Sequence, residues 1–309
     1  MVSINIGVSS CLLGNRVRYD GRERKDTFIR YILSRHATLI PICPETEMGL
    51  SVPRPPLNLK REGDTTRLIS TKDGRDYAPL LKRWAKKRIR GLKRLSIDGF
   101  IFKCRSPSCG FGDAKIYIDK GRKTIRGNGL FVDMVLKAFP LVPVESDERL
   151  YDPSIRESFF EKILLLKRWR DTLNKSERLE NILKFHRENR MIILSKSKKI
   201  YESLERLISK IEDLPKDRAI LEYQSYLLDA LRFRVSKRKR LGVIRSILKD
   251  MEGLIEESEK AYIEELMDLY IKDQIPFPAL ITPLRYLLIR YQLKDHLLDN
   301  FFNPTNYLF

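Results

Sequence analysis

The sequence predicts an α/β N-terminal domain with a parallel, Rossmann-like sheet, followed by an all-α C-terminal domain. Through residues 1–150, short apolar strands alternate with helices, which is the pattern of a parallel α/β sheet. After Tyr151-Asp-Pro153, which has the character of a linker, the pattern is almost entirely helical. A chain of 309 residues has room for about two domains. We therefore expect domains at 1–150 and 151–309.

Strand and helix signals alternate in the first domain. Apolar runs bounded by Gly, Pro and Ser indicate buried strands, and apolar residues at helical spacing indicate amphipathic helices. The expected strands are 1–10, 38–42, 99–102 and 141–144, with a small strand at 116–118. A hairpin is possible within 57–75, with Thr65 to Ser70 followed by a turn at Lys72-Asp-Gly74. The expected helices are 25–36, 77–95 and 130–139.

The second domain carries long helical patterns separated by proline-containing breaks. Pro cannot continue a helix, so Leu214-Pro215 and Ile275 to Pro278 mark helix boundaries. The expected helices are 155–174, 177–209, 217–235, 238–272 and 279–298.

The charge is strongly basic and unevenly distributed. The chain has 60 Lys and Arg against 41 Asp and Glu, a formal net charge of +19. Residues 1–150 hold 30 basic and 16 acidic residues (net +14), and residues 151–309 hold 30 and 25 (net +5). Such a field attracts polyanions, of which nucleic acid is the usual one. A heat-adapted surface is the alternative, although it explains the one-sided balance less well.

Several classes of protein are disfavoured by missing signals. No apolar stretch has the length of about 18 residues that a membrane span needs, and the N-terminus does not resemble a secretory signal. We therefore expect a cytoplasmic protein without a membrane partner, in which four cysteines act as ligands or catalysts rather than disulfides. The glycine-rich motifs of nucleotide-binding loops are also absent.

All four cysteines follow predicted strands. Cys11 follows the first strand, Cys43 the second, and Cys104 and Cys109 the third. The carboxyl ends of parallel strands meet at one edge of a sheet, where ligands bind. Converging thiolates would form a metal site, a cluster site or a redox centre. The alternative is four buried free cysteines of the kind that many cores contain.

The spacing of the cysteines bears on the kind of metal. Thiolates select zinc, copper(I) or iron–sulfur clusters. A structural zinc site usually shows a Cys-x-x-Cys or His-x-x-x-His pair, whereas Cys104 and Cys109 are five residues apart. Four cysteines would close an iron–sulfur cluster, and three would leave one iron open to a substrate. Cys104 is either the fourth ligand or a buried thiol that points away.

Three oxygen-bearing side chains lie beside these cysteines. Glu45 follows Cys43 by two residues, and a carboxylate there can activate water or shuttle protons. Ser106 and Ser108 precede Cys109 and could hydrogen-bond a sulfide or a substrate. The alternatives are a surface or capping glutamate and ordinary Ser-Pro-Ser turn chemistry. In the second domain, His186 lies on a basic helix, where it faces a nucleic-acid groove or is a satisfied interface histidine.

A set of motifs in the first half resembles the thiouracil desulfurase family. These motifs are Ser-x-Cys11-Leu-Leu-Gly, Arg-Tyr-Asp20-Gly21, Cys43-Pro-Glu45, Pro53-Arg54-Pro and Ser106-Pro-Ser-Cys109-Gly. The second half is similar to a helical domain often fused to that family. It carries Lys184-Phe-His-Arg-Glu-Asn-Arg-Met191, Ile275-Pro-Phe-Pro-Ala-Leu280 and Asn303-Pro304. The two-domain arrangement resembles the tRNA 4-thiouridine desulfidases.

The resemblance implies a cofactor and a set of site residues. It implies a [4Fe–4S] cluster held by Cys11, Cys43 and Cys109, with an open iron that binds the sulfur of a thiolated uracil. It implies Glu45 as the catalytic glutamate, and Ser106 as the catalytic serine, with Ser108 as second choice. Cys104 does not belong to the family pattern.

The expected function is therefore that of a tRNA 4-thiouridine desulfidase, an enzyme that converts 4-thiouridine to uridine by non-redox, hydrolytic C–S cleavage. Thiolated tRNA is the expected partner, bound through the basic surface, and the oligomeric state stays open. One alternative is desulfidation of free thiouracil, and another is a non-enzymatic RNA-binding protein with a structural metal site. A thiolase that inserts sulfur is disfavoured, because the chain lacks an adenylation loop.

Overall fold

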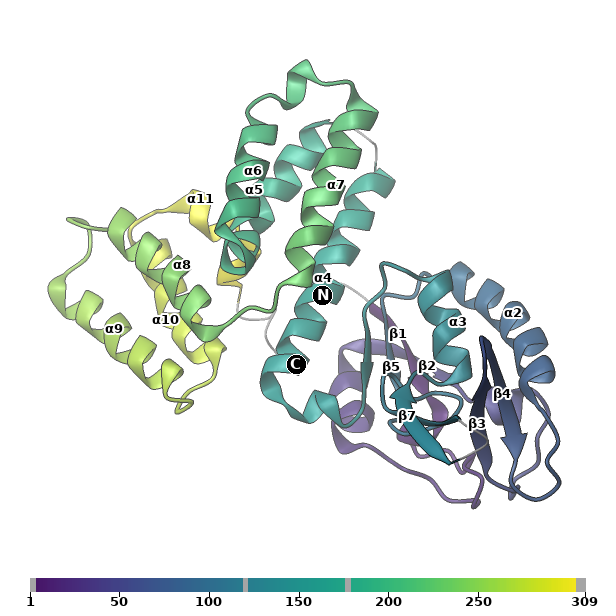
Figure 1. Ribbon diagram of the computed structural model, residues 1–309. Helices are drawn as coiled ribbons and strands as arrows, with labels where there is room; N and C mark the ends of the chain where they lie inside the picture. The colour runs from purple at the N-terminus through teal and green to yellow at the C-terminus, as the bar shows by residue number, and fades with distance from the viewer. Residues whose placement is uncertain (1–3, 119–121, 176–178, 304–309) are drawn as a thin grey trace. The chain divides into compact units, whose positions relative to one another are not determined.

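The computed structural model describes residues 4–118, 122–175 and 179–303 (Figure 1). Of the positions discussed above, residues 1–3, 177, 178 and 304 lie outside these ranges. The chain forms two compact units, Met1–Ile163 and Leu164–Phe309. The division falls 13 residues after residue 150, inside the long helix α4 (Pro153–Lys175).

The first unit contains a parallel sheet of four strands in the order β2-β1-β5-β8. Its strands are β1 (Ile4–Ser9), β2 (Ala37–Ile42), β5 (Gly99–Phe102) and β8 (Val144–Ser146). Every pairing is parallel, with Ile6 opposite Leu39 on one side and Gly99 on the other. The prediction of a parallel α/β domain followed by helices is confirmed. The last strand begins three residues later than expected.

A second sheet of four strands has the order β4-β3-β6-β7. Its strands are β3 (Leu57–Glu62), β4 (Thr65–Ser70), β6 (Ala114–Ile118) and β7 (Lys123–Gly127). The expected strand Thr65 to Ser70 is β4, and the turn expected after it leads only to an isolated bridge between Ile69 and Asp76. The main antiparallel partner of β4 is β3, which precedes it and was not predicted. The small strand at 116–118 is part of β6. The sequence did not indicate β7, whose residues Lys123 to Arg126 are all exposed.

Helices α2 (Ala78–Arg94) and α3 (Leu130–Ala138) pack together in the first unit, with the Trp84 and Phe131 rings 5.2 Å apart (Figure 1). Both helices match their predictions. The expected helix at 25–36 is instead a π-helix (Phe28–Ile32) followed by a 3-10 turn (Leu33–Arg35). A short helix that the sequence analysis did not identify, α1 (Pro44–Glu47), follows Cys43.

The second unit is helical. After α4, its helices are α5 (Leu179–Lys196), α6 (Lys198–Ile208), α7 (Lys216–Arg232), α8 (Lys237–Asp250), α9 (Glu257–Ile271), α10 (Phe277–Arg290) and α11 (Lys294–Leu297). Three expected helices, 177–209, 238–272 and 279–298, are each divided in two. Ser197 ends one and caps the next by accepting a hydrogen bond from the Ile200 backbone N–H. Gly253, with φ of +78°, lies in the turn between α8 and α9.

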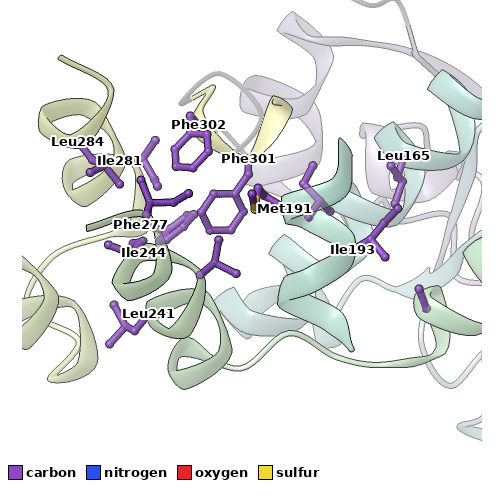
Figure 2. Packing of buried hydrophobic residues seen from close by; sticks show 14 of the residues in the cluster. Leu165, Met191, Ile193, Leu241, Ile244, Phe277, Ile281, Leu284, Phe301 and Phe302 are labelled. Atoms are coloured by element: carbon purple, nitrogen blue, oxygen red, sulfur yellow. The ribbon is translucent and has the colours of Figure 1, made fainter. Parts of the chain in front are cut away.

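Aromatic and aliphatic side chains fill the core of the second unit. Phe277 packs against Phe301 in this core, and Ile244 belongs to the same cluster (Figure 2). His186 on α5 is 4 % exposed and is hydrogen-bonded to Tyr223 of α7 and Glu205 of α6. It is therefore a satisfied histidine at the interface between these helices. Within the part of the chain that the structure describes, no helix has the length and apolar character that crossing a bilayer requires.

Candidate active site

A cavity of about 390 Å³ lies in the first unit, and all four cysteines line it. Its walls come from the ends of strands β1, β2 and β5, from the loop before β3, and from the segment 17–24. The predicted convergence of the cysteines is therefore observed. The lining residues are Ser9, Ser10, Cys11, Val17, Arg18, Tyr19, Arg24, Ile42, Cys43, Pro44, Glu45, Arg54, Pro56, Leu57, Lys103, Cys104, Arg105, Ser106, Pro107 and Cys109.

Cys11 and Cys43 are positioned by the turns that follow neighbouring strands. Cys11 lies in a 3-10 helix, Ser10–Leu13, which Gly14 ends with φ of +92°. Cys43 is the residue before α1, and Pro44 occupies the first helical position, where its missing N–H costs no hydrogen bond. The helix therefore begins at once after Cys43, and this places Glu45 in its first turn beside the thiol.

Cys109 is positioned by the start of α3. The backbone N–H groups of Gly129, Leu130 and Phe131 donate to the carbonyls of Gly110, Pro107 and Ser108, respectively. A Cβ atom on Gly129 would lie only 2.5 Å from the Ser108 carbonyl carbon, so this close approach requires glycine. The Ser-Pro-Ser-Cys turn is thus fixed by hydrogen bonds that involve its own backbone.

Burial raises the pKa of two of these thiols, Cys11 and Cys109. The pKa of Cys11 rises to about 12, first through burial and then through the nearby Cys43. The pKa of Cys109 is also raised well above its ordinary value, by burial and by Cys43, against a hydrogen bond with Ser9. Cys11, Cys43 and Cys109 all line the same cavity. A metal that binds them must release protons, because the thiolate is the ligand form.

Glu45 is held by two partners at the cavity wall. Its Oε2 pairs with Arg54 Nη2 at 2.7 Å and accepts from Arg54 Nε at 2.8 Å. Its Oε1 accepts from Ser108 Oγ at 2.9 Å. The side chains of Arg54 and Glu45 are only 5 % and 13 % exposed, so the ion pair offsets the desolvation of both charges.

Arg54 is in turn fixed by the backbone around it. Its Nη2 donates to the Val17 carbonyl at 2.9 Å, and its backbone N–H donates to the Tyr19 carbonyl at 2.8 Å. The loop before β3 is thereby joined to the segment 17–24, and the carboxylate of Glu45 is held in one orientation.

The two serines before Cys109 have different contacts. Ser106 lines the cavity, and its Oγ accepts from the backbone N–H groups of Ser108 and Cys109. A hydroxyl that accepts twice still has its own proton to donate. Ser108 is 1 % exposed and donates to Glu45. The structure therefore puts Ser106 at the cavity wall and Ser108 behind the carboxylate.

Cys104 lines the same cavity but has other partners. Its Sγ lies 2.6 Å from Lys103 Nζ, and its backbone N–H donates to Asp147 Oδ1 at 2.7 Å. Burial raises the pKa of Cys104, and the hydrogen bond from Lys103 opposes that rise.

The donor set fits an iron–sulfur cluster. Within residues 4–118, 122–175 and 179–303, no group of three or more His, Cys, Asp or Glu side chains is arranged to hold a metal ion. The four cysteines line a space of about 390 Å³. Thiolates spread around a cavity suit a group with several metal atoms, and soft sulfur donors suit iron–sulfur clusters.

Three residues of this site, Arg54, Lys103 and Asp147, had no role predicted from the sequence. Arg54 belongs to a quoted motif, but its contact with Glu45 depends on the path of an irregular loop. Lys103 and Asp147 follow β5 and β8, which are neighbours in the sheet. A charged residue after each of two predicted strands was the available signal for this pair.

Comparisons with known proteins give two family matches. Residues 6–147 match the family described as 2-thiouracil desulfurase, and residues 190–305 match one described as Protein of unknown function (DUF1722). A solved structure titled as the [4Fe-4S]-dependent thiouracil desulfidase TudS is similar at 29 % identity, covers 48 % of this chain and 94 % of its own, and has a TM-score of 0.39. No curated protein matches the chain.

Proposed function

Because the chain carries a 2-thiouracil desulfurase domain over residues 6–147, we propose that it is an iron–sulfur enzyme that removes sulfur from thiolated uracil, and that its substrate is 4-thiouridine in tRNA. The family match supports desulfidation of a thiouracil. The observation that carries the cluster is the set of Cys11, Cys43 and Cys109, which line one cavity beside the paired Glu45.

The cavity supplies the groups that a hydrolytic reaction needs. A [4Fe–4S] cluster on Cys11, Cys43 and Cys109 would supply an open iron as Lewis acid for the substrate sulfur. Glu45 takes a proton from water as the water oxygen bonds to C4 of the base, and it returns a proton as the C–S bond breaks. One water is consumed and hydrogen sulfide leaves, so the reaction needs no electrons.

The other polar groups orient this acid–base residue and the substrate. Arg54 and Ser108 hold the two carboxylate oxygens of Glu45, so its position is set before substrate binds. Ser106 offers its hydroxyl proton to a group of the base in the cavity. In folded tRNA, the thiolated base has to leave its stack to enter the cavity.

A polyanionic substrate is supported by the surface of α2. This helix contains eight Lys and Arg residues and no acidic residue. Arg88 pairs with Glu47 and donates a hydrogen bond to the Pro41 carbonyl, so it is already engaged within the protein. The other cations are exposed and available for phosphates, which proteins contact without regard to sequence. They are Lys82, Arg83, Lys86, Lys87, Arg90, Lys93 and Arg94.

The test begins with protein purified without oxygen. Its visible absorption and iron content are measured, and the thiouridine absorption of added 4-thiouridine tRNA is followed. We expect broad brown absorption, about four irons per chain, and loss of the thiouridine band. A colourless zinc protein would contradict the proposal and would leave an RNA-binding protein with a structural metal.

The substrate is tested by comparing thiolated tRNA with free 4-thiouracil. The double variant Lys86→Glu/Lys87→Glu should slow turnover of tRNA, steeply with salt, and leave free 4-thiouracil unaffected. Lys249→Glu/Lys272→Glu makes the same change in net charge next to the acidic helix α9 and serves as the matched control. Equal activity on both substrates, with no effect of the α2 variant, would favour the free base as substrate.

A further inference from the structure

Cys104 is a fourth thiol in a cavity where a fourth ligand would be harmful to the proposed reaction. Full cluster ligation takes four cysteines, and a closed cluster has no iron for a substrate. Cys104 lines the same cavity as Cys11, Cys43 and Cys109. The proposed reaction therefore requires the protein to keep the Cys104 sulfur away from the open iron.

Two cationic side chains, Lys103 and Arg105, donate hydrogen bonds to the Cys104 sulfur. Lys103 Nζ lies 2.6 Å from Sγ and also pairs with Asp147 Oδ2 at 2.7 Å. The side chains of Lys103 and Asp147 are only 14 % and 7 % exposed. Arg105 Nη2 lies 3.9 Å from the same sulfur, and the Arg105 guanidinium also pairs with Glu148. Hydrogen bonds from charged donors are about twice as strong as neutral ones.

The backbone is fixed on both sides of the sulfur. The Cys104 N–H donates to Asp147 Oδ1 at 2.7 Å, and the Arg105 N–H donates to Asp113 Oδ1 at 2.9 Å. Arg105 has φ of +58°, in the left-handed region that non-glycine residues seldom adopt. The chain thus turns sharply after Cys104 and is fastened where it turns. Asp147 contributes to both restraints, since one oxygen holds the backbone and the other holds Lys103.

We propose that the Lys103–Asp147 pair is a positioning device that holds the Cys104 sulfur away from the cluster and so keeps one iron open. The inference rests on the proposed function. Lys103 donates a charged hydrogen bond to this sulfur, and moving Cys104 toward the cluster would leave the partly buried Lys103 ammonium with one partner fewer. By contrast, the sulfur of Cys43 has only a long 3.9 Å contact with the Val17 carbonyl among its hydrogen-bond contacts in the described residues.

The experiment compares wild type, Lys103→Met, Cys104→Ala and the double variant Lys103→Met/Cys104→Ala. Each is purified without oxygen and measured for circular dichroism and iron content. Mild oxidation then tests for the open site, because a cluster with three protein ligands loses its fourth iron and gives a three-iron paramagnetic signal. Turnover of 4-thiouracil is measured in parallel.

We expect wild type and Cys104→Ala to release one iron on oxidation and to turn over equally. Lys103→Met should keep its iron under the same oxidation. If the closed form holds about nine-tenths of the molecules, turnover falls about tenfold. The double variant should regain both the iron release and the turnover, because it has no sulfur to close the cluster.

The outcomes separate this inference from the proposed function. A wild type without iron would overturn both. A wild type with iron and a Lys103→Met variant that still releases one iron would overturn the inference alone. So would a double variant that stays as slow as Lys103→Met, since Lys103 would then act on something other than Cys104.

Discussion

Glu45 in the first unit is a partly buried carboxylate and Asp299 in the second is a fully buried one, and they have different partners. Glu45 is paired with the Arg54 guanidinium and accepts from Ser108, and it lines a cavity. Asp299 is 1 % exposed and accepts from the backbone N–H groups of Met191 and Phe301, at 2.9 and 2.8 Å. One carboxylate is matched to a cation at a cavity wall, and the other joins α5 to the final turn.

Asp299 shows what burial does to a carboxylate that has no close counter-charge. Burial raises the pKa of Asp299 to about 6, and its two backbone donors and the more distant Arg190 and Arg168 reduce that rise only in part. Burial without a close counter-charge disfavours the charged form of a carboxylate. Asp299 is in that position, whereas Glu45 has Arg54 within 2.7 Å. This contrast supports the proposed acid–base role of Glu45 and a structural role for Asp299.

The largest effect is expected for Glu45→Gln, which removes the acid–base group and preserves its size. Turnover of a thiolated substrate should fall by about 10²–10⁴-fold, the usual contribution of a positioned acid–base residue. Iron content should be unchanged, because Glu45 is not among the proposed ligands. Glu62→Gln, at an exposed glutamate of the same unit, is the control. Turnover equal to wild type would refute the catalytic role.

The next effect concerns the ion pair between Arg54 and Glu45. Arg54→Met would leave the partly buried Glu45 without its cation, and the cost should approach, without exceeding, the value of about 3–5 kcal/mol for a fully buried pair. Urea unfolding of the metal-free chain, followed by circular dichroism, measures the loss. The control is Arg67→Met, because the Arg67–Glu62 pair is about half exposed and should contribute about 0–1 kcal/mol.

Adding Glu45→Gln to Arg54→Met sharpens the result. The double variant no longer buries an unpaired charge, so it should recover part of the lost free energy of unfolding. The coupling between the two sites should be about 1–3 kcal/mol. Additive single-variant effects would mean that Arg54 stabilises the loop before β3 through its backbone contacts alone.

The parts of the fold that the sequence predicted are those decided by local pattern. Strand β5 is a continuous apolar run and β1 is a mostly apolar one, and the residues of both are largely buried, so their strand character is visible before any tertiary contact. Strand β7, with the sequence Lys-Thr-Ile-Arg-Gly, is mostly exposed and is defined by its antiparallel pairing with β6. Such a strand depends on a neighbour that composition does not reveal.

The candidate site, like the fold, was predictable from the sequence only in part. The convergence of the cysteines follows from the rule that parallel strands end at one edge, and the order β2-β1-β5 makes their carrier strands adjacent. The partners of Glu45 and Cys104 do not follow from that rule. Arg54 reaches Glu45 across a loop, and Asp147 reaches Lys103 only because β8 lies beside β5.

The smallest expected effect is the pH dependence that Asp299 gives to stability. Its pKa in the folded chain is about 6, above the ordinary 3.8, so the folded state holds this proton more tightly than the unfolded state. The stabilisation is complete below pH 3.8 and is lost as the pH rises through 6. Between pH 5 and pH 7 the free energy of unfolding should fall by about 1.4 kcal/mol from this group.

Asp299→Asn tests that contribution, because an amide does not titrate in this range. The variant is expected to lose some stability at pH 5, where one backbone donor loses its acceptor, and to lose the dependence on pH between 5 and 7. Urea unfolding of the metal-free chain at both values measures it, with the exposed Asp64→Asn as control. If Asp299→Asn kept the full pH dependence, another group would be its source. The contrast between the two carboxylates would then not hold.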